Sequence, residues 1–449
     1  MKQLRRISLV LCMSVGWFGI APGVMAAATT DELVAICEGL YGGVYGVPNG
    51  EPLGVCQWDK ALINASDVGS YGLATGAGVM VGVIDSGVDF NHPDIAPNLD
   101  VTLSCSFIFD STPTAEPGEI ANGDCSNKAA VQDLSGHGSH VASIIAAPIN
   151  GIGIAGVAPE ATLVAIKACT RQGYCFADSV AAALNYAGAV GLDVVNLSLF
   201  ADPYLYYCGS DAEQRAIYKA LQGAAKYAMQ QGVLIVASAG NQQSDLQHPG
   251  IDTSSPNWPP GSEEDRIIRN NCRVAQAELP GVMTVSATGP VGYPGYDLWI
   301  ADYSSVGMSR VDVAAPGGDY FRATGTVQDA VLAATSSTGD MWDNFDPLEA
   351  VFPGITVLDQ GARYVYLNGT SMSSPQAAGV AALVKQVHPD WDPGDIKAAV
   401  QRSAQQLECP PDWEPLNGGD ERERCYGNNG RTSFFGHGIV DAEAAALVE

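Results

Sequence analysis

A small-residue turn, Asn368-Gly369-Thr370-Ser371-Met372-Ser373-Ser374-Pro375, places a serine where it could act as a nucleophile. The turn runs directly into an apolar helical pattern, so the hydroxyl of Ser371 is expected at a helix N-terminus. Unpaired backbone N–H groups and the helix dipole favour a developing negative charge at that position, which suits acyl transfer. Taken alone, however, the same turn is an ordinary Ser/Thr helix cap. Ser371 therefore needs partners before it can be assigned a chemical role.

Candidate partners lie in three further motifs. Asp85 directly follows the apolar run 79–84, and Asn241 closes a motif that follows the run 233–239. His137 begins a small-residue helical pattern, and the glycines beside it let a ligand or side chain approach closely. Each motif alone could be a turn or a cap. Together they supply Asp, His, Asn and Ser, the residue types used in nucleophilic acyl transfer.

Nearby residues of the same types compete for two of these roles. His140 shares roughly one helix face with His137, but only the residue in the first turn points toward a sheet edge, so we expect His140 to be structural. Three aspartates compete with the strand-end aspartate, but none of them ends an apolar run: Asp89, Asp94 and Asp133.

Short apolar runs alternate with helical patterns from residue 79 onward. Continuous apolar runs of strand length are typical of buried parallel strands. The alternation predicts an α/β fold with a doubly wound, mostly parallel sheet flanked by helices. Ligands of such sheets bind beyond the carboxyl ends of the strands, where the polar motifs lie. The strand runs are 79–84, 163–168, 194–199, 233–239, 283–287 and 311–314, and the helical patterns are 139–146, 177–190, 211–231 and the stretch from the Ser371 turn to 387.

Composition and charge exclude several function classes. The chain has 449 residues, of which 47% are hydrophobic and 16% charged, so it is globular. Its net charge of −27, from 49 acidic and 22 basic residues, repels nucleic acid and anionic membranes. We therefore expect neither as a partner, and we expect a monomer.

The N-terminus carries the pattern of an export signal. Lys2, Arg5 and Arg6 precede an apolar run over 7–20, and Val24-Met25-Ala26 resembles a cleavage site. Residues 1–26 are therefore predicted to be a signal peptide, since the run is too short and interrupted for a membrane anchor. The mature protein is expected to be secreted or periplasmic and free of the membrane.

The rest of the chain reads as one large domain with additions. Residues 27–66 are rich in turn formers and form an N-terminal segment, too short for a full-size pro-domain. Residues 67–449 form the main domain, interrupted by polar stretches near 242–278 and 317–363 that are predicted to be long surface insertions.

Cysteine usage indicates disulfides. Of the 11 cysteines, Cys12 lies in the predicted signal, and the even number that remains suits an exported protein. A zinc cluster is the weaker alternative, because no pair has ligand spacing. Connectivity is not fixed by sequence, but closeness along the chain favours Cys37–Cys56, Cys105–Cys125, Cys169–Cys175 and Cys409–Cys425, which leaves Cys208 with Cys272.

The four motifs, in this chain order, resemble those of the subtilisin-like serine peptidases (subtilases, peptidase family S8). The matching segments are V-I-D-S-G-V at 83–88, H-G-S-H-V-A at 137–142, S-A-G-N at 238–241 and G-T-S-M-S-S-P at 369–375. The resemblance extends from about Gln57 to the C-terminus, because residues 436–442 resemble the closing segment of the family. It implies a subtilisin-like fold and a secreted serine endopeptidase.

The resemblance also implies a role for each candidate. Ser371 would attack the scissile carbonyl, His137 would transfer the proton, and Asp85 would orient and stabilise the imidazole, in the manner of the Ser-His-Asp triad. Asn241, with the N–H of Ser371, would form the oxyanion hole.

Substrate and metal positions follow from the same resemblance. Ser198, Leu199 and Phe200 match a family segment that lines the pocket for the residue before the scissile bond, except that Phe200 replaces a glycine. The ring is expected to narrow the pocket and the specificity, unless it turns outward onto the inserted loops. A structural calcium ion is expected, with no organic cofactor, and its ligands would be Asp94, Asn150 and the carbonyls of Pro148, Ile152 and Ile154, with Gln57 as a further candidate. The alternative is a plain hydrogen-bonded loop.

Three function classes remain open from the sequence. The leading one is an endopeptidase acting on protein or peptide substrates through an acyl-enzyme. A ligase or cyclase would pass the acyl group to an amine instead of water, which a triad alone does not distinguish. A silent binding protein on the same fold is disfavoured by the intact motifs, although fold alone does not imply activity.

Overall fold

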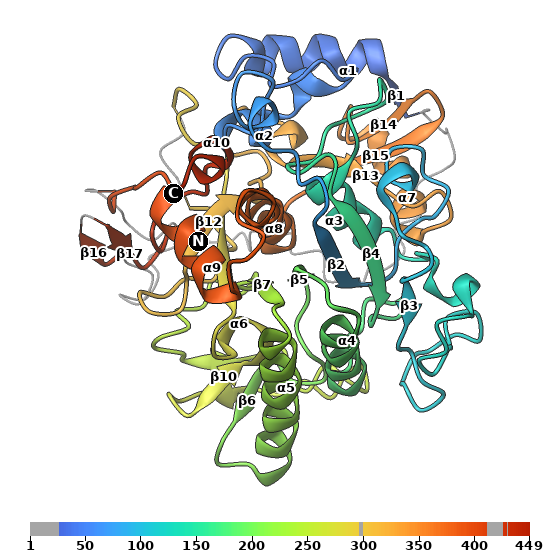
Figure 1. Ribbon diagram of the computed structural model, residues 1–449, viewed down its shortest axis with the longest axis vertical. Coiled ribbons are helices and arrows are strands. Elements are labelled where there is room, and N and C mark those ends of the chain that lie inside the picture. The colour runs from blue at the N-terminus through green and yellow to red at the C-terminus, as the bar shows by residue number, and fades with distance from the viewer. Residues whose placement is uncertain (1–26, 296–299, 411–424, 429) are drawn as a thin grey trace, which may run out of the picture.

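A seven-stranded parallel sheet lies at the centre of the protein. The computed structural model describes residues 27–295, 300–410, 425–428 and 430–449. The strand order is β12-β11-β7-β5-β2-β4-β3, and all neighbouring strands run parallel (Figure 1). The strands are β2 (Met80–Asp85), β3 (Cys105–Ser106), β4 (Thr162–Lys167), β5 (Val194–Leu197), β7 (Leu234–Ser238), β11 (Met283–Thr288) and β12 (Val313–Pro316).

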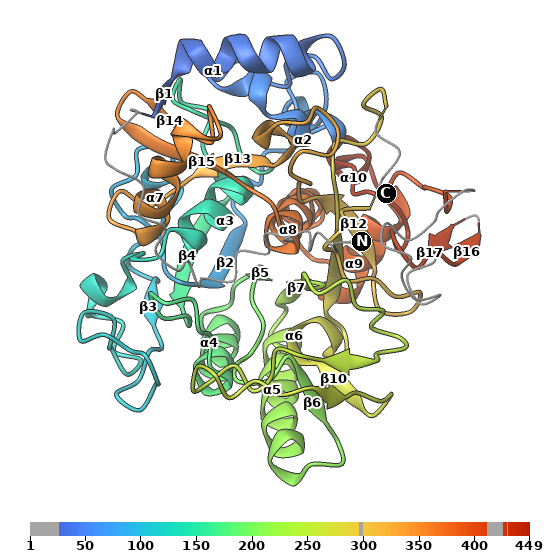
Figure 2. The same cartoon turned by 180° about the vertical axis from the view of Figure 1, so that it is seen from behind.

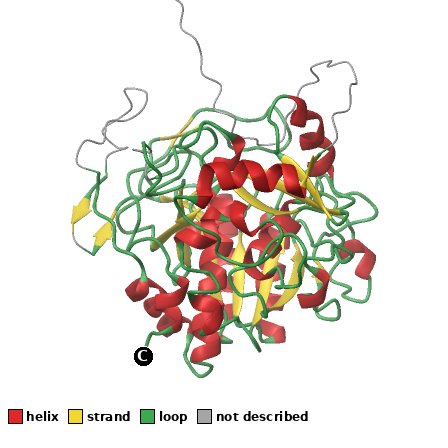
Figure 3. Ribbon diagram, turned by 90° about the horizontal axis from the view of Figure 1, so that it is seen from above, coloured by secondary structure: helices red, strands yellow, loops and turns green. Residues whose placement is uncertain are grey.

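Helices cover both faces of this sheet, which is why its strands are apolar throughout. α3 (His137–Ala146) packs against α8 (Thr370–Val387), and α4 (Ala177–Val190) packs against α5 (Ala212–Gln230) (Figures 1 and 3). In β4, Leu163 and Ala165 belong to the core beneath α3 and α8, whereas Val164 and Ile166 belong to the core beneath α4 and α5. Successive side chains of a strand point to opposite faces, so this alternation defines the two layers.

The predicted α/β fold is confirmed. Each predicted strand run overlaps an observed strand, with ends that differ by at most two residues, and α4 has the predicted bounds. Asp211 caps α5, because its carboxylate accepts a hydrogen bond from the N–H of Gln214 at 2.9 Å.

The N-terminal segment has more regular structure than its turn-rich sequence predicts. Thr29 and Glu32 form a capping box, a signal that our sequence reading missed, and it starts α1 (Thr30–Cys37). The preceding strand β1 (Ala28–Thr29) pairs with β14 of the main domain, and the disulfide Cys37–Cys56 closes a loop within the segment. The segment is therefore built into the body of the protein (Figure 2).

The stretch 317–363 is only partly a surface insertion, so that expectation needs correction. It contributes to a second sheet of order β1-β14-β15-β13, formed with β13 (Val331–Ala334), β14 (Thr356–Asp359) and β15 (Ala362–Leu367). The side chains of β13 and most of β15 are buried. The polar residues that suggested a loop lie between these short strands, in and around α7 (Asp340–Phe345).

The stretch 242–278 is closer to expectation, with long loops and short pairs of strands. Its β10 (Cys272–Val274) pairs with β6 (Tyr206–Cys208), and β8 (Ile251–Asp252) pairs with β9 (Arg266–Ile267). The remaining helices and strands are α2 (Trp58–Leu62), α6 (Ala275–Glu278), α9 (Pro393–Ser403), α10 (Ala442–Ala446), β16 (Gly427–Asn428) and β17 (Arg431–Thr432).

All five predicted disulfides are present: Cys37–Cys56, Cys105–Cys125, Cys169–Cys175, Cys208–Cys272 and Cys409–Cys425. Such a set is typical of a protein that folds in an oxidising compartment. The predicted signal peptide lies outside the described residues. Within the described part of the chain, no helix combines the length and the apolar character that a membrane span requires.

Candidate active site

The four candidate side chains come from elements that end or begin at one edge of the central sheet. Asp85 is the last residue of β2, and Asn241 follows β7 after a two-residue turn. His137 begins α3, and Ser371 is the second residue of α8. In a parallel sheet these strand ends and helix starts lie at the same edge, which is where such folds bind ligands.

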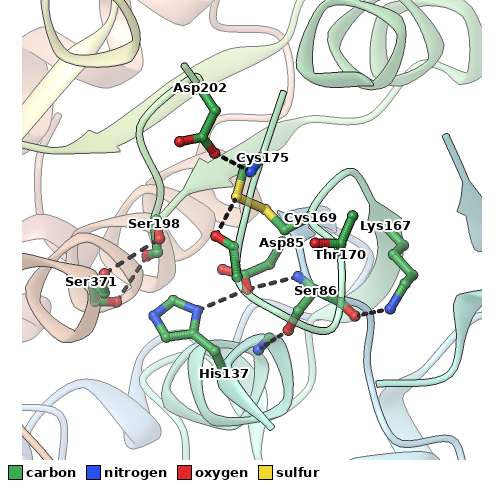
Figure 4. Close-up of a disulfide and its surroundings, with 12 residues drawn as sticks. Asp85, Ser86, His137, Lys167, Cys169, Thr170, Cys175, Ser198, Asp202 and Ser371 are labelled. Carbon is green, nitrogen blue, oxygen red and sulfur yellow. Dashed lines mark hydrogen bonds and ion pairs between the residues drawn. A yellow bond between two sulfur atoms is a disulfide. The ribbon is translucent and has the colours of Figure 1, made fainter. Parts of the chain in front are cut away.

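Asp85 and His137 are joined by a hydrogen bond. The distance from His137 Nδ1 to Asp85 Oδ1 is 2.8 Å (Figure 4). The Asp85 side chain is only 2% exposed, whereas that of His137 is 26% exposed. The N–H of Ser86 also donates to Asp85 Oδ1, at 2.7 Å. The buried carboxylate thus holds the Nδ1 edge of the imidazole, and the rest of the ring remains partly exposed.

The surroundings of His137 raise the pKa of its imidazole. Burial by itself lowers that pKa, but the charge of Asp85, its hydrogen bond and the charge of Asp133 outweigh this effect. The protonated imidazole is therefore stabilised, as a residue that accepts a proton during a reaction requires.

Ser371 lies next to His137 in the site but makes its hydrogen bond elsewhere. Figure 4 shows the His137 ring between Asp85 and Ser371. Ser371 Oγ donates to the carbonyl of Ser198 at 3.3 Å, and Ser198 Oγ donates to the carbonyl of Ser371 at 2.8 Å. Catalytic hydrogen bonds are often long or poorly aligned without substrate, so this arrangement does not argue against a Ser371–His137 contact during a reaction.

Asn241 directs its amide toward the start of α8. Its Oδ1 accepts hydrogen bonds from the N–H of Thr370 at 2.9 Å and from Thr370 Oγ at 2.7 Å, which fixes the orientation of the side-chain amide. A Cβ built on Gly369 would lie 3.5 Å from Asn241 Nδ2 and 3.6 Å from the Ser371 nitrogen. Two N–H donors therefore flank one small space beside the serine.

A polar network behind the site was missed from sequence. Ser86 Oγ donates to Asp133 Oδ1 at 3.0 Å and accepts from the N–H of Gly138 at 2.9 Å. Asp133 also accepts from the N–H and Oγ of Ser139. From the sequence, Asp133 was considered only as an alternative to Asp85. It instead joins the Asp85 turn to the first turn of α3.

The second histidine of the motif is structural, as expected. His140 is fully buried, and its Nε2 is 3.0 Å from the carbonyl of Val365. Burial lowers the pKa of His140 to about 3. It is therefore neutral at neutral pH and is committed to a backbone contact.

The segment predicted to line the substrate pocket contacts Ser371. Ser198 and Leu199 are buried, and Ser198 makes the two contacts with Ser371 described above. Phe200 is half-buried and packs against an apolar cluster that contains Ala239, Leu246 and Ile268. The cluster draws its members from several segments, so the ring is partly covered by apolar side chains and partly exposed at the surface.

Comparison with known proteins identifies the family. The sequence profile of the family Peptidase_S8, described as the subtilase family, matches residues 76–438. The chain belongs to the subtilase family. Subtilisin BL of Lederbergia lenta is 29% identical over 388 residues, which cover 86% of this chain and 97% of that protein. This subtilase is therefore a serine endopeptidase, a hydrolase that acts on protein or peptide substrates.

Solved structures agree on the fold. Fervidolysin from Fervidobacterium pennivorans, a keratinolytic enzyme related to subtilisin, superposes with a TM-score of 0.59 and 25% identity, over 89% of this chain but only 47% of its own. The epidermin leader peptide processing serine protease of Staphylococcus aureus gives a TM-score of 0.62 and 23% identity, over 88% of this chain and 81% of its own. The second likeness supports the fold alone.

The predicted calcium loop of this subtilase offers oxygen atoms that suit a hard cation. Asp94 is buried, and its Oδ1 has no hydrogen-bond partner within the described residues. The carbonyls of Pro148, Ile152 and Ile154 likewise accept no hydrogen bond from the described part of the chain. Asn150 Oδ1 accepts the N–H of Ile152 at 2.9 Å. Carboxylate, amide and carbonyl oxygens are the ligands that Ca²⁺ prefers.

Two further residues, Gln57 and Glu51, make hydrogen bonds at or near this loop. Gln57 Oε1 already accepts hydrogen bonds from Asn49 Nδ2 at 2.9 Å and from the N–H of Ala155 at 3.0 Å. Glu51 was missed from sequence and is buried beside the loop. Its Oε1 accepts a hydrogen bond from the N–H of Gly151 at 3.2 Å, and its Oε2 has no hydrogen-bond partner among the described residues. No group of three His, Cys, Asp or Glu side chains in the described chain forms a metal cluster. Any cation here would therefore rely mainly on amide and carbonyl oxygens, which fits Ca²⁺.

The electrostatics of His137 yield a test by titration. We expect the His137 imidazole to titrate above the ordinary value of about 6.5, because Asp85 stabilises its charged form. Asp85→Asn removes that charge, burial then dominates, and the pKa should fall below the ordinary value. NMR of the imidazole resonances against pH measures both values. His437, whose pKa is lowered by its own burial, is the internal control, and equal His137 pKa values in the two proteins would contradict the assignment.

Proposed function

We propose that this subtilase is an exported endopeptidase that hydrolyses peptide bonds through an acyl-enzyme on Ser371, with His137 as general base and acid and Asp85 as its orienting carboxylate. The observation that carries the proposal is the 2.8 Å hydrogen bond between His137 and buried Asp85, opposite the helix start that bears Ser371. Asp85 selects the imidazole tautomer with its proton on Nδ1, which leaves Nε2 free to accept a proton.

The reaction would proceed by two proton transfers through His137. Ser371 Oγ attacks the scissile carbonyl while His137 Nε2 takes its proton, and the same proton then passes to the leaving amine. A water molecule repeats the sequence on the acyl-enzyme. The oxyanion of each tetrahedral intermediate would accept hydrogen bonds from Asn241 Nδ2 and the N–H of Ser371, the two donors that flank one space beside the serine. Water as the acceptor gives hydrolysis, and an amine in its place would give ligation.

Export is proposed from two independent features. Residues 1–26 have the charge and apolar pattern of a signal peptide. The five disulfides suit an oxidising location, secreted or periplasmic. We expect the mature enzyme to act as a monomer, without nucleic-acid or membrane partners.

We further propose that the calcium loop holds a structural ion with Asp94, Asn150 and the carbonyls of Pro148, Ile152 and Ile154 as ligands. Buried Asp94 has an oxygen without a hydrogen-bond partner among the described residues, and leaving such a group unpaired is costly. The three carbonyls accept no hydrogen bond from the described chain and so are available as ligands. A divalent cation would supply the positive charge that the buried Asp94 carboxylate lacks. Its contribution would be to stability, because no hydrogen bond among the described residues joins the loop to Asp85, His137 or Ser371.

The catalytic assignment is tested with an active-site label. A fluorophosphonate should label the wild-type enzyme, and Ser371→Ala should abolish both labelling and casein cleavage, because the reactive hydroxyl is gone. Asn241→Ala is the matched variant. It should still be labelled, but more slowly, and its kcat should fall by about 10²–10³, which is the order of loss when an oxyanion-hole donor is removed from subtilisin. Equal labelling of wild type and Ser371→Ala would remove Ser371 as the nucleophile. Labelling without cleavage would point to high selectivity or to ligation.

The pocket assignment is tested at Phe200. With a ring on the pocket wall, we expect a narrow preference for the substrate residue before the scissile bond, and Phe200→Gly should broaden it by enlarging the pocket. A peptide library varied at that residue measures kcat/KM for both proteins, and Phe200→Leu is the control that keeps an apolar side chain. Uniform cleavage of the library by the wild type would show that Phe200 turns away from the substrate.

The calcium proposal is tested by thermal unfolding. EDTA should lower the Tm, and added Ca²⁺ should restore it, because a ligand that binds only the folded state stabilises by about 2.7 kcal/mol at a hundred times its Kd. Asp94→Asn should unfold at a lower temperature and should lose the response to Ca²⁺. A wild-type Tm that does not change on chelation would support the plain hydrogen-bonded loop.

A further inference from the structure

A buried ion pair lies directly behind Asp85. Lys167 ends β4, and the register of the parallel strands pairs it with Asp85 at the end of β2. The side chains of Lys167 and Glu119 are both fully buried, and Lys167 Nζ is 3.0 Å from Glu119 Oε1. Removing two charges from water is expensive, so a pair at this depth needs further contacts to be maintained.

The contacts of the Lys167 ammonium lead to the catalytic aspartate. Nζ donates to the carbonyl of Ser86 at 2.6 Å and approaches that of Gln132 at 3.4 Å. The N–H of the same Ser86 donates to Asp85 Oδ1 at 2.7 Å. Figure 4 shows Lys167, Ser86, Asp85 and His137 in this order. Lys167 thus fixes the residue that hydrogen-bonds to Asp85.

Ser86 also connects this chain of contacts to the helix that bears the histidine. Its hydroxyl accepts the N–H of Gly138 in the first turn of α3 and donates to buried Asp133. A Cβ on Gly138 would lie 2.0 Å from the carbonyl oxygen of Gly87, so the two segments are in direct contact. A shift of Ser86 would move both ends of the Asp85–His137 hydrogen bond.

Glu119 connects Lys167 to two disulfide-closed loops. It lies in the loop closed by Cys105–Cys125, and its Oε1 also accepts the N–H of Arg171 at 2.6 Å. Arg171 belongs to the loop closed by Cys169–Cys175, and its guanidinium pairs with Asp340 at 2.6 Å. Glu119 therefore anchors Lys167 to disulfide-closed loops that are held at both ends.

We propose that Lys167, paired with Glu119, is a positioning residue that sets the orientation of Asp85 toward His137 through Ser86. The proposal rests on the proposed catalytic function. It assigns the ion pair a part in the geometry of the reaction in addition to any part in folding.

The test must separate positioning from stability. Lys167→Met alone leaves Glu119 as an uncompensated buried charge, which destabilises the fold whatever else the residue does. In Lys167→Met/Glu119→Gln both charges of the pair are removed, and replacing a buried pair in this way is often neutral for stability. Buried Asp133, which the charge of Lys167 also stabilises, keeps its hydrogen bonds to Ser86, Ser139 and the N–H of Gly136. A kinetic defect of the double variant at an unchanged Tm then reflects the loss of Lys167 beside the site and not unfolding, and the pH midpoint tests the Asp85–His137 hydrogen bond.

We expect the double variant to have a Tm close to that of the wild type and a kcat about tenfold to a hundredfold lower, with KM within about twofold. This is the order of loss when partners that orient an active-site group are removed, as known for metal ligands. The acid-side midpoint of the pH profile of kcat should also move down, because a looser Asp85–His137 hydrogen bond stabilises the imidazolium less.

A second buried lysine pair among the described residues, Lys60 with Asp59 at 2.7 Å, offers a matched control. It contacts Gln376 of α8, and within the described chain it makes no hydrogen bond with Ser86, Asp85 or His137. Lys60→Met/Asp59→Asn should change the Tm at most and leave the pH midpoint in place. A wild-type kcat in the Lys167/Glu119 double variant would overturn the proposal, and so would a low kcat with an unmoved midpoint, since Asp85 would then be unaffected. Activity that survives in Ser371→Ala would instead show that the proposed catalytic function is wrong.

Discussion

The carboxylate of Asp85 is a charge held at the end of a buried strand, and much of the site follows from satisfying it. The side chain is 2% exposed, so water cannot solvate it, and an unpaired charge at that depth would be costly. Its Oδ1 is shared by the N–H of Ser86 and the imidazole of His137. The same contacts that make the carboxylate tolerable also fix the tautomer and direction of the histidine. The hydrogen bonds of Oδ1 thus both stabilise the buried charge and orient His137, whereas Oδ2 has no hydrogen-bond partner among the described residues.

The architecture makes this arrangement possible with few residues. A parallel sheet brings its strand ends and the following helix starts to one edge, so residues 85, 137, 241 and 371 meet although they are far apart in sequence. Close packing of the two turns needs small residues, and Gly138 provides the space in which the carbonyl of Gly87 lies. Ser371 begins a helix whose free N–H groups favour negative charge. In the proposed mechanism, the N–H of Ser371 at this helix start would donate to the oxyanion.

The sequence predicted the parts of this protein that depend on local pattern. Continuous apolar runs located the strands of the central sheet, and the residues that follow them, Asp85 and Asn241, were correctly located at its edge. Closeness along the chain was sufficient for the disulfide pairs, because each of the four short ones closes a local loop.

Features that depend on contacts between distant segments were not predictable in this way. The strands β13 and β15 are short and separated by polar residues, so the stretch resembled a surface loop although Val331 and Tyr364 are fully buried. Lys167 lies inside an apolar run and was not singled out from sequence, since its partner Glu119 lies 48 residues away in an irregular loop. The hydrogen bond from Ser371 to Ser198 depends on a side-chain rotamer, which residue patterns do not specify.

The loops that surround the site make its selectivity a separate problem from its chemistry. The loop between Cys169 and Cys175 is contacted by residues from both inserted stretches: Asp340 pairs with Arg171, and the Trp258 ring packs on Tyr174 with centroids 5.4 Å apart. Asp202, four residues beyond Ser198, accepts hydrogen bonds from the N–H of Cys175 and from Asn257. We call these loops the rim of the site. Loops held by so many contacts would lose little entropy when a substrate binds, which favours the affinity of a matching substrate. They would also adapt little to a substrate that does not match, which favours selectivity. The triad would supply the reaction, and the rigid rim would decide which peptide reaches it.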